Sequence, residues 1–273
     1  MPPQLPPTTH MGPVTLAVRD LDQELRFYRD VLGMRVHAHA AREAALGGPD
    51  EVLLKLRAEP DARPRPRGAA GLYHVAYLVP TRGDLGRAIA HLVEARYPLQ
   101  GASDHEFSEA LYLADPEGNG IEIYADRPRE AWPRFEELTW ARMGPQPMDV
   151  ESVLAEGASR AWEGYPEGTR VGHVHLNVND VPPASAFYRD ALGLDMVIDL
   201  GSAAFLSAGG YHHHIAANTW GTQGGPPNAD DTLGLRELTI VIPDAEAQEE
   251  AVMRLGSETP VDPSGNRVRL ARD

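Results

Sequence analysis

Cysteine is absent from the 273 residues, and its absence excludes three kinds of site at once. The chain has no disulfides, no zinc–thiolate sites and no thiol nucleophile. A reducing compartment suits such a sequence, so we expect a cytoplasmic protein.

Long apolar runs and positive charge are also scarce. No stretch approaches the roughly 20 apolar residues of a membrane-spanning helix, and the N-terminal MPPQLPPTTHMGP lacks the pattern of a secretory signal. With 25 Lys and Arg against 40 Asp and Glu, the net charge is −15, which argues against nucleic acid and anionic membranes as partners. We expect a globular protein preceded by a flexible leader over residues 1–10.

What the chain does contain is an internal repeat. Residues 12–33 read GPVTLAVRDLDQELRFYRDVLG and residues 172–193 read GHVHLNVNDVPPASAFYRDALG, which is identical at half of the positions without a gap. A weaker echo joins GLYHVAYLVP (71–80) to GLRELTIVIP (234–243). Similarity of this extent indicates duplicated structural modules.

Each module predicts a strand, a helix and then three strands. The alternating, β-branched segments 14–18 and 174–178 predict first strands. Asp20 and Asp180 stand where the N-caps of the following helices belong, and a glycine ends each helix. Short strands follow, and a D-P-x-G-N turn precedes the last of them.

Four such modules predict two domains, over residues 11–126 and 170–273. Residues 127–169 lack the pattern and predict a linker, in which VESVLAEGASRAW (150–162) is expected to form a helix.

This organisation resembles the vicinal-oxygen-chelate superfamily, which includes glyoxalase I, bleomycin-resistance proteins and extradiol ring-cleaving dioxygenases. The resemblance covers nearly the whole chain. The segments DPEGNGIEIYADRPR (115–129) and GYHHHIAAN (210–218) in particular are similar to the catechol 2,3-dioxygenase branch. The resemblance implies an α+β fold in which four βαβββ modules pair into cup-shaped curled sheets, with a metal on the inner wall.

The resemblance also implies the metal ligands. The superfamily's ligand positions in modules two and three fall on His74, Glu122 and His173. The matching positions in modules one and four, which lack such a ligand set, are Pro13, Glu237 and Arg269. Two histidines and one carboxylate form the facial triad of non-haem Fe(II) oxygenases, which leaves positions open for substrate and O₂. The expected cofactor is Fe(II), and Mn(II) suits the same ligands.

Three consecutive histidines, His212–His214, cannot all bind one ion from a regular strand, because successive side chains point to opposite faces. We expect His212 and His214 to share one face and His213 to take the other. The extradiol branch carries a histidine beside the O₂ position in the motif H-H-x-[IL]-A. This resemblance assigns catalytic proton transfer to His213, with His214 as the alternative and as a substrate-binding residue.

Two further catalytic residues follow from the same resemblance. Tyr112 matches a tyrosine that hydrogen-bonds the catecholate, and His105 lies near the place of a substrate-facing histidine. His175 shares the face of His173 by strand alternation, but no family role maps to it. Trp220 and Phe107 are expected to help set which ring substituents fit.

These features together predict extradiol cleavage of a small aromatic diol, with that diol and O₂ as partners. Two other functions stay open. A glyoxalase-type isomerase would need a fourth protein ligand, and a non-catalytic binding protein of the bleomycin-resistance type would lack metal ligands. The oligomeric state is open as well, although sheet edges in such folds often pair into a homo-oligomer.

Overall fold

The computed structural model describes residues 4–134, 144 and 146–272; parts of the expected leader (1–3) and of the expected linker (135–143 and 145) lie outside them. The described chain forms two compact units. Unit 1 consists of Met1–Arg19, Glu59–His74 and Gly172–Asp273, and unit 2 of Asp20–Ala58 and Val75–Val171. Unit 1 therefore draws residues from both expected domains, whereas unit 2 comes from the first expected domain and the expected linker, apart from residues 170 and 171.

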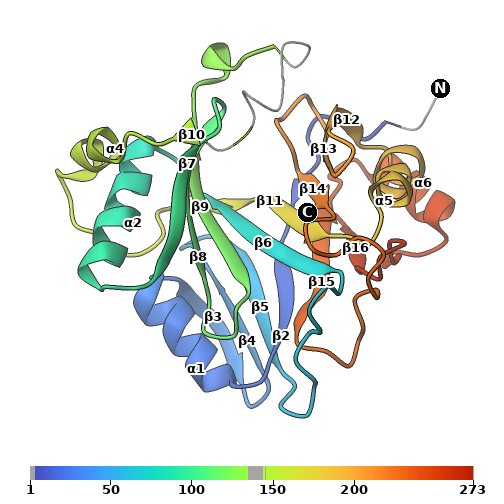
Figure 1. Ribbon diagram of the computed structural model, residues 1–273, viewed down its shortest axis with the longest axis horizontal. Helices are drawn as coiled ribbons and strands as arrows, with labels where there is room; N and C mark the ends of the chain where they lie inside the picture. The colour runs from blue at the N-terminus through green and yellow to red at the C-terminus, as the bar shows by residue number, and fades with distance from the viewer. Residues whose placement is uncertain (1–3, 135–143, 145, 273) are drawn as a thin grey trace. The chain divides into compact units, whose positions relative to one another are not determined.

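Unit 1 contains two groups of paired strands (Figure 1). In the first group β15 pairs with β1, β2 and β16, and in the second the order is β6, β11, β14, β13, β12. The elements are β1 (His10–Met11), β2 (Val14–Val18), the start of β6 (Gly71–Leu78), β11 (Arg170–Asn177), α5 (Val181–Ala186), η4 (Phe187–Leu192), β12 (Asp195–Asp199), β13 (Ala203–Ser207), β14 (Ile215–Asn218), β15 (Gly234–Val241), α6 (Ala245–Leu255) and β16 (Val268–Ala271).

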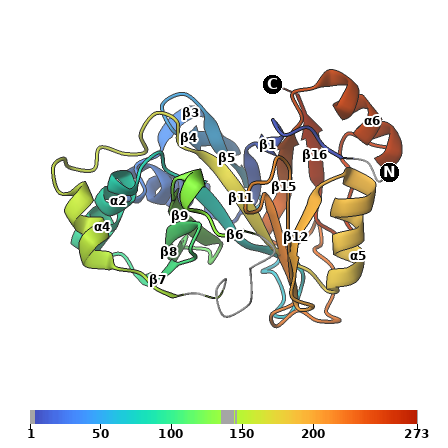
Figure 2. The same cartoon turned by 90° about the horizontal axis from the view of Figure 1, so that it is seen from above.

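Unit 2 contains the strand orders β5, β4, β3 and β10, β7, β8, β9, β6. Helices α2 and α4 lie side by side in both views (Figure 1, Figure 2). The elements are α1 (Leu21–Arg26), η1 (Phe27–Val31), β3 (Arg35–Ala40), β4 (Glu43–Gly47), β5 (Val52–Ala58), the end of β6, α2 (Arg82–Glu94), β7 (Leu99–Asp104), β8 (Ser108–Ala114), β9 (Gly120–Asp126), η2 (Arg129–Ala131), β10 (Gln146–Pro147) and α4 (Val150–Gly157). No helix in the described part of the chain is long and apolar enough to cross a membrane.

The repeated strand–helix pattern is present in both halves, and the expected α+β class is confirmed. Asp20 caps α1, accepting a hydrogen bond from the backbone N–H of Gln23 at 2.9 Å. Asp180 occupies the same place before α5 but makes no such bond. The reason is that the second and third helical residues, Pro182 and Pro183, have no N–H to donate.

The helices end differently from a simple α-helix. In both repeats the FYRD segment forms a π-helical turn, η1 after α1 and η4 after α5. Gly193 then adopts a left-handed conformation with φ of 105°, as expected for a helix terminator.

The start of the chain differs from the expected flexible leader. Leu5 is buried, and its N–H donates to the carbonyl of Gly193. Thr9 is buried as well, and β1 begins at His10 and pairs with β15. These residues are ordered because an apolar side chain and a strand edge anchor them to unit 1.

Strand β11 separates the core of unit 1 from its histidine-bearing face. Val174 and Leu176 are fully buried and lie beside Ile215 and Ala217 of β14. Because side chains alternate along a strand, His173, His175 and Asn177 project from the opposite face.

Candidate active site

Two of the expected ligands lie close together within unit 1. His74 is on β6 and His173 is on the neighbouring β11, and their ring centroids are 5.5 Å apart. Both side chains are buried. The pairing of β6 with β11 is what brings a residue of module two beside a residue of module three.

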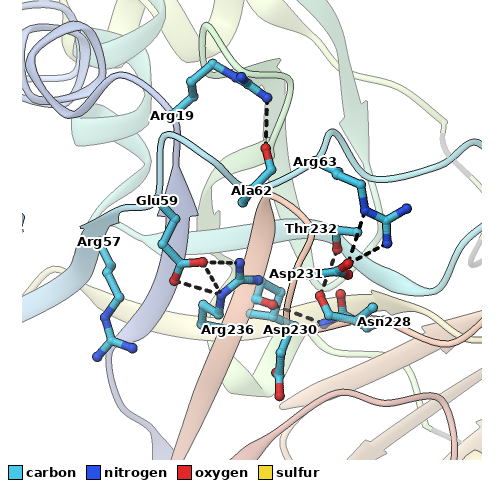
Figure 3. A network of polar contacts seen from close by, with 12 residues as sticks. Arg19, Arg57, Glu59, Ala62, Arg63, Asn228, Asp230, Asp231, Thr232 and Arg236 are labelled. Atoms are coloured by element: carbon cyan, nitrogen blue, oxygen red, sulfur yellow. Dashed lines mark hydrogen bonds and ion pairs between the residues drawn. The ribbon is translucent and has the colours of Figure 1, made fainter.

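Ion pairs hold the segment that precedes His74, residues 59–73, against the rest of unit 1 (Figure 3). Arg236 forms a bidentate contact with Glu59, the closest N–O distance being 2.5 Å, and Arg63 pairs with Asp231 at 2.6 Å. Beyond them Arg65 donates to the carbonyl of Leu72 at 2.7 Å. Arg236 is largely buried in its pair, so this contact restricts the segment more than an exposed pair would.

The histidine triplet does not form part of a strand, so the strand from which the alternation of its side chains was expected is absent. Residues 211–214 form a loop that follows a turn at Gly209 and Gly210, both with positive φ, and β14 begins only at Ile215. A loop is not bound by the two-residue period of a strand.

In this loop the rings of His212 and His214 both contact that of Tyr211, and His213 is hydrogen-bonded to His212. The Nδ1 atoms of His212 and His213 are joined by a hydrogen bond of 2.8 Å, and the ring of His213 lies 4.0 Å from that of His173 between centroids. His214 instead accepts the backbone N–H of Ala208 at Nδ1. The structure thus places His213 beside an expected ligand and gives His214 a contact with the backbone.

His213 is neutral around pH 7. Burial, and next the neighbouring imidazole of His173, lower the pKa of His213 well below its usual range. A neutral imidazole has a lone pair that accepts a proton, which is the state that a general base requires.

In unit 2, Glu122 lies among the other expected residues. It is buried on β9, directly across from Tyr112 on β8. A hydrogen bond of 2.7 Å joins the Tyr112 hydroxyl to Nε2 of His105. The antiparallel register therefore brings together a carboxylate, a phenol and an imidazole that the sequence separates.

His74, Glu122 and His173 are buried side chains that can together hold a metal ion. Their donor set of two imidazoles and one carboxylate fits a divalent transition metal. The matching residues in module four are paired with each other. Arg269 forms a bidentate ion pair with Glu237, and the shorter contact is 2.7 Å. This pair neutralises the carboxylate that would otherwise attract a cation.

Sequence reasoning assigned no role to His175, yet the structure places its ring 4.9 Å from that of His74. Strand alternation beside His173 was the available signal. The rings of Tyr73 and Trp220 also lie next to His175, at 4.9 and 5.6 Å. Phe107 instead packs against Trp132, 5.3 Å away between centroids.

Known proteins are similar to this chain in sequence or in fold. The model of the Glyoxalase/Bleomycin resistance protein/Dioxygenase superfamily matches residues 10–123 and 170–258. The chain is 44% identical over 242 residues to a catechol-2,3-dioxygenase from Bacillus subtilis (strain 168), which covers 87% of this chain and 84% of that protein. It is 28% identical over 184 residues to biphenyl-2,3-diol 1,2-dioxygenase 3 from Rhodococcus globerulus, over 57% of this chain and 90% of the relative. The crystal structure of glyoxalase I from Zea mays has a similar fold, with a TM-score of 0.56 at 15% identity over 97% of this chain and 92% of that one.

Proposed function

Since this chain belongs to the Glyoxalase/Bleomycin resistance protein/Dioxygenase superfamily, we propose that it is an extradiol dioxygenase that opens a catechol-type ring with O₂. Its relation to a catechol-2,3-dioxygenase over most of its length makes it an oxidoreductase of the dioxygenase type. The observation that carries the proposal is the buried group of His74, Glu122 and His173, in a chain that has no thiolate ligands.

These three side chains would hold Fe(II), or Mn(II), which the same ligands suit. Bound there, the ion would bring the two diol oxygens and O₂ into one coordination sphere. A set of three protein ligands supports this reading over the glyoxalase-type alternative, since three ligands leave room for both the diol and O₂.

His213 is proposed as the residue that moves a proton. Its ring centroid lies 4.0 Å from that of His173, so a neutral His213 is placed beside the expected ligands to accept the proton that a diol hydroxyl loses. The protonated ring can then return that proton to a substrate oxygen as the ring opens. His214 is the weaker candidate for this role, because its Nδ1 already accepts the N–H of Ala208.

Tyr112 and His105 are proposed to orient the diol. The phenol and the imidazole are joined by one hydrogen bond, so a substrate oxygen that contacts the Tyr112 hydroxyl is coupled to the imidazole of His105. Tyr112 faces Glu122 across the β8–β9 pair, which supports a place for both near a bound diol.

Oxygen consumption tests the proposal. Protein loaded with Fe(II) under argon and then given catechol and air should consume O₂ and form a yellow ring-opened semialdehyde. We expect His74→Ala to abolish both signals, with His39→Ala, a change of an exposed histidine, as the matched control.

Stoichiometric metal binding without oxygen uptake for any diol would favour the isomerase. Failure of the wild-type protein to bind metal would contradict the ligand assignment and favour a non-catalytic binding protein.

A further inference from the structure

An aromatic surface lies beside His74 in unit 1. Tyr73 and Trp220 meet edge to face, with ring centroids 5.7 Å apart and planes at 82°. His175 contacts both rings and also that of His74, the last at 4.9 Å. These separations lie in the range of favourable aromatic contacts.

The two largest rings of this surface are open to solvent. Tyr73 is 42% exposed and Trp220 is 41% exposed. Single exposed apolar side chains are ordinary, whereas small-molecule sites are lined mostly by apolar and aromatic side chains with a few fixed polar groups among them.

The exposed Trp220 is held firmly from its backbone. Its N–H donates to Oδ1 of Asn218 at 2.8 Å, and the Asn218 amide nitrogen lies 2.9 Å from Nε2 of His175. A backbone N–H can only donate, so Oδ1 is fixed as the acceptor and the amide nitrogen donates to His175. One buried side chain therefore sets both Trp220 and His175.

The residues that flank Trp220 are fastened as well. The N–H of Thr219 donates to the carbonyl of Ser202 at 3.0 Å, and the hydroxyl of Thr222 donates to the carbonyl of Val178 at 2.7 Å. An aromatic ring on so restricted a backbone loses little conformational entropy when it binds a ligand.

The two ends of the histidine cluster differ in chemistry. His213 lies against His173, whereas Tyr73 and Trp220 lie around His175 and His74. The end at His213 therefore suits proton transfer, and the end at Tyr73 and Trp220 suits contact with an apolar ring.

We propose that Trp220, supported by Tyr73, is a specificity-determining residue that receives an apolar, ring-bearing substituent of the diol. The inference rests on the proposed function and deepens it: the preferred substrate is a catechol that carries an aryl group rather than catechol itself. Asn218 and His175 are positioning residues for this surface.

The first readout is selectivity. The ratio of kcat/KM for a phenyl-substituted catechol to kcat/KM for catechol is measured with Fe(II)-loaded protein. We expect Trp220→Ala to lower this ratio about tenfold, and Trp220→Phe, which keeps an aromatic ring, to lower it less than threefold or so. Met253→Ala, a change of a 74% exposed side chain on α6, should leave the ratio unchanged.

The second readout does not depend on turnover. A phenyl-substituted phenol has a single hydroxyl and is not ring-cleaved, so its dissociation constant can be measured by calorimetry on Fe(II)-loaded protein under argon. Trp220→Ala should raise this constant about tenfold, and Tyr73→Leu should raise it as well. Thermal melts confirm that each variant is folded, and Tyr73→Leu serves if Trp220→Ala is not.

The outcomes separate the two proposals. Binding that depends on Trp220 in a protein that cleaves no diol would refute the dioxygenase and keep the aromatic surface. If the protein cleaves diols but Trp220→Ala changes neither the selectivity ratio nor the dissociation constant, the role of the aromatic surface is refuted and the dioxygenase proposal stands. An equal loss with both diols and unchanged binding of the phenol would also overturn the role of Trp220.

Discussion

Glu24 and Asp115 bring two carboxyl groups together in the interior of unit 2. The N–H of Glu117 donates to both of them, at 3.1 Å to Glu24 and 3.0 Å to Asp115. Asp115 also accepts hydrogen bonds from the hydroxyl of Tyr28 and from two nitrogens of Asn119. Asp115 accepts more of these hydrogen bonds than Glu24, and they stabilise its charged form. Glu24 is therefore the group that keeps a proton.

Glu24 should therefore make stability depend on pH. Burial, and then the charge of Asp115, raise the pKa of Glu24 to about 9 from an ordinary value of 4.5. A folded-state pKa above the unfolded one means that the stabilisation is complete below about pH 4.5 and is lost as the pH rises towards 9. Glu24→Gln removes the ionisation, so its free energy of unfolding should fall less between pH 5 and pH 8, by at most about 1.4 kcal/mol per pH unit.

Urea unfolding followed by circular dichroism at both pH values measures the effect. The exposed Glu94→Gln on α2 is the matched control and should follow the wild-type profile. Identical pH dependence in Glu24→Gln and wild type would show that Glu24 ionises normally.

The second repeat shows what the sequence could and could not reveal at this scale. Tyr188, Asp262 and Asn266 reproduce the bonds of the first repeat, and the FYRD and D-P-x-G-N segments that carry them recur in the sequence. Ala184 stands where the first repeat has Glu24, so the alignment shows the difference. It does not show that Glu24 is fully buried, because burial depends on which elements pack on that helix face.

At the scale of elements, helices α2 and α4 approach each other through glycine. A Cβ at Gly86 would overlap the carbonyl oxygen of Val153, and one at Gly157 would lie 2.6 Å from the N of Arg87. Arg82 adds ion pairs to Glu109 on β8 and to Glu156 on α4, each at 2.5 Å. The close contact of the backbones leaves no room for a methyl group.

Gly86→Ala should therefore destabilise the protein by about 1–3 kcal/mol, the usual cost of overpacking. The sign is informative, because alanine in place of glycine stabilises an open helix position by up to about 1 kcal/mol. Thermal or urea unfolding gives the difference. Gly83→Ala, three residues earlier, places its Cβ 3.1 Å from the carbonyl oxygen of Glu156, which a small shift relieves, and should cost clearly less. Equal stability of Gly86→Ala and wild type would mean that α4 moves away freely.

Periodicity predicted most strands but not their partners. The alternating segment 14–18 predicts a strand, yet nothing in it indicates that β2 pairs with β15 near the other end of the chain. Pairing between β6 and β11 is equally invisible in the sequence, and it is this pairing that joins His74 to His173. Edge pairing is decided by tertiary packing, which a single sequence does not encode locally.

The strand expected at His212–His214 is a loop in the structure, and the reason is related. The triplet directly precedes β14, which begins at Ile215, but Gly209 and Gly210 with positive φ turn the chain just before the triplet. Two glycines permit such a turn without requiring it, so the sequence alone could not decide between strand and loop.

At the scale of the whole molecule, the duplicated modules give two sets of positions at which a metal could bind, and the side chains of one set suit a metal. The first has His74, Glu122 and His173; the second has an ion pair between Glu237 and Arg269. If the first holds the ion, metal stabilises the folded state and the melting temperature rises with metal concentration, because the unfolded chain has no assembled site.

Fe(II) or Mn(II) at about 100 times its dissociation constant should add about 2.7 kcal/mol, or several degrees in melting temperature. We expect His173→Ala and Glu122→Gln to abolish this shift under argon. Glu237→Gln breaks the pair with Arg269 and is the matched control: its melting temperature without metal falls slightly, and its response to metal stays intact. A shift that survives in His173→Ala but disappears in Glu237→Gln would move the metal to modules one and four, and the proton-transfer role of His213 would fall with it.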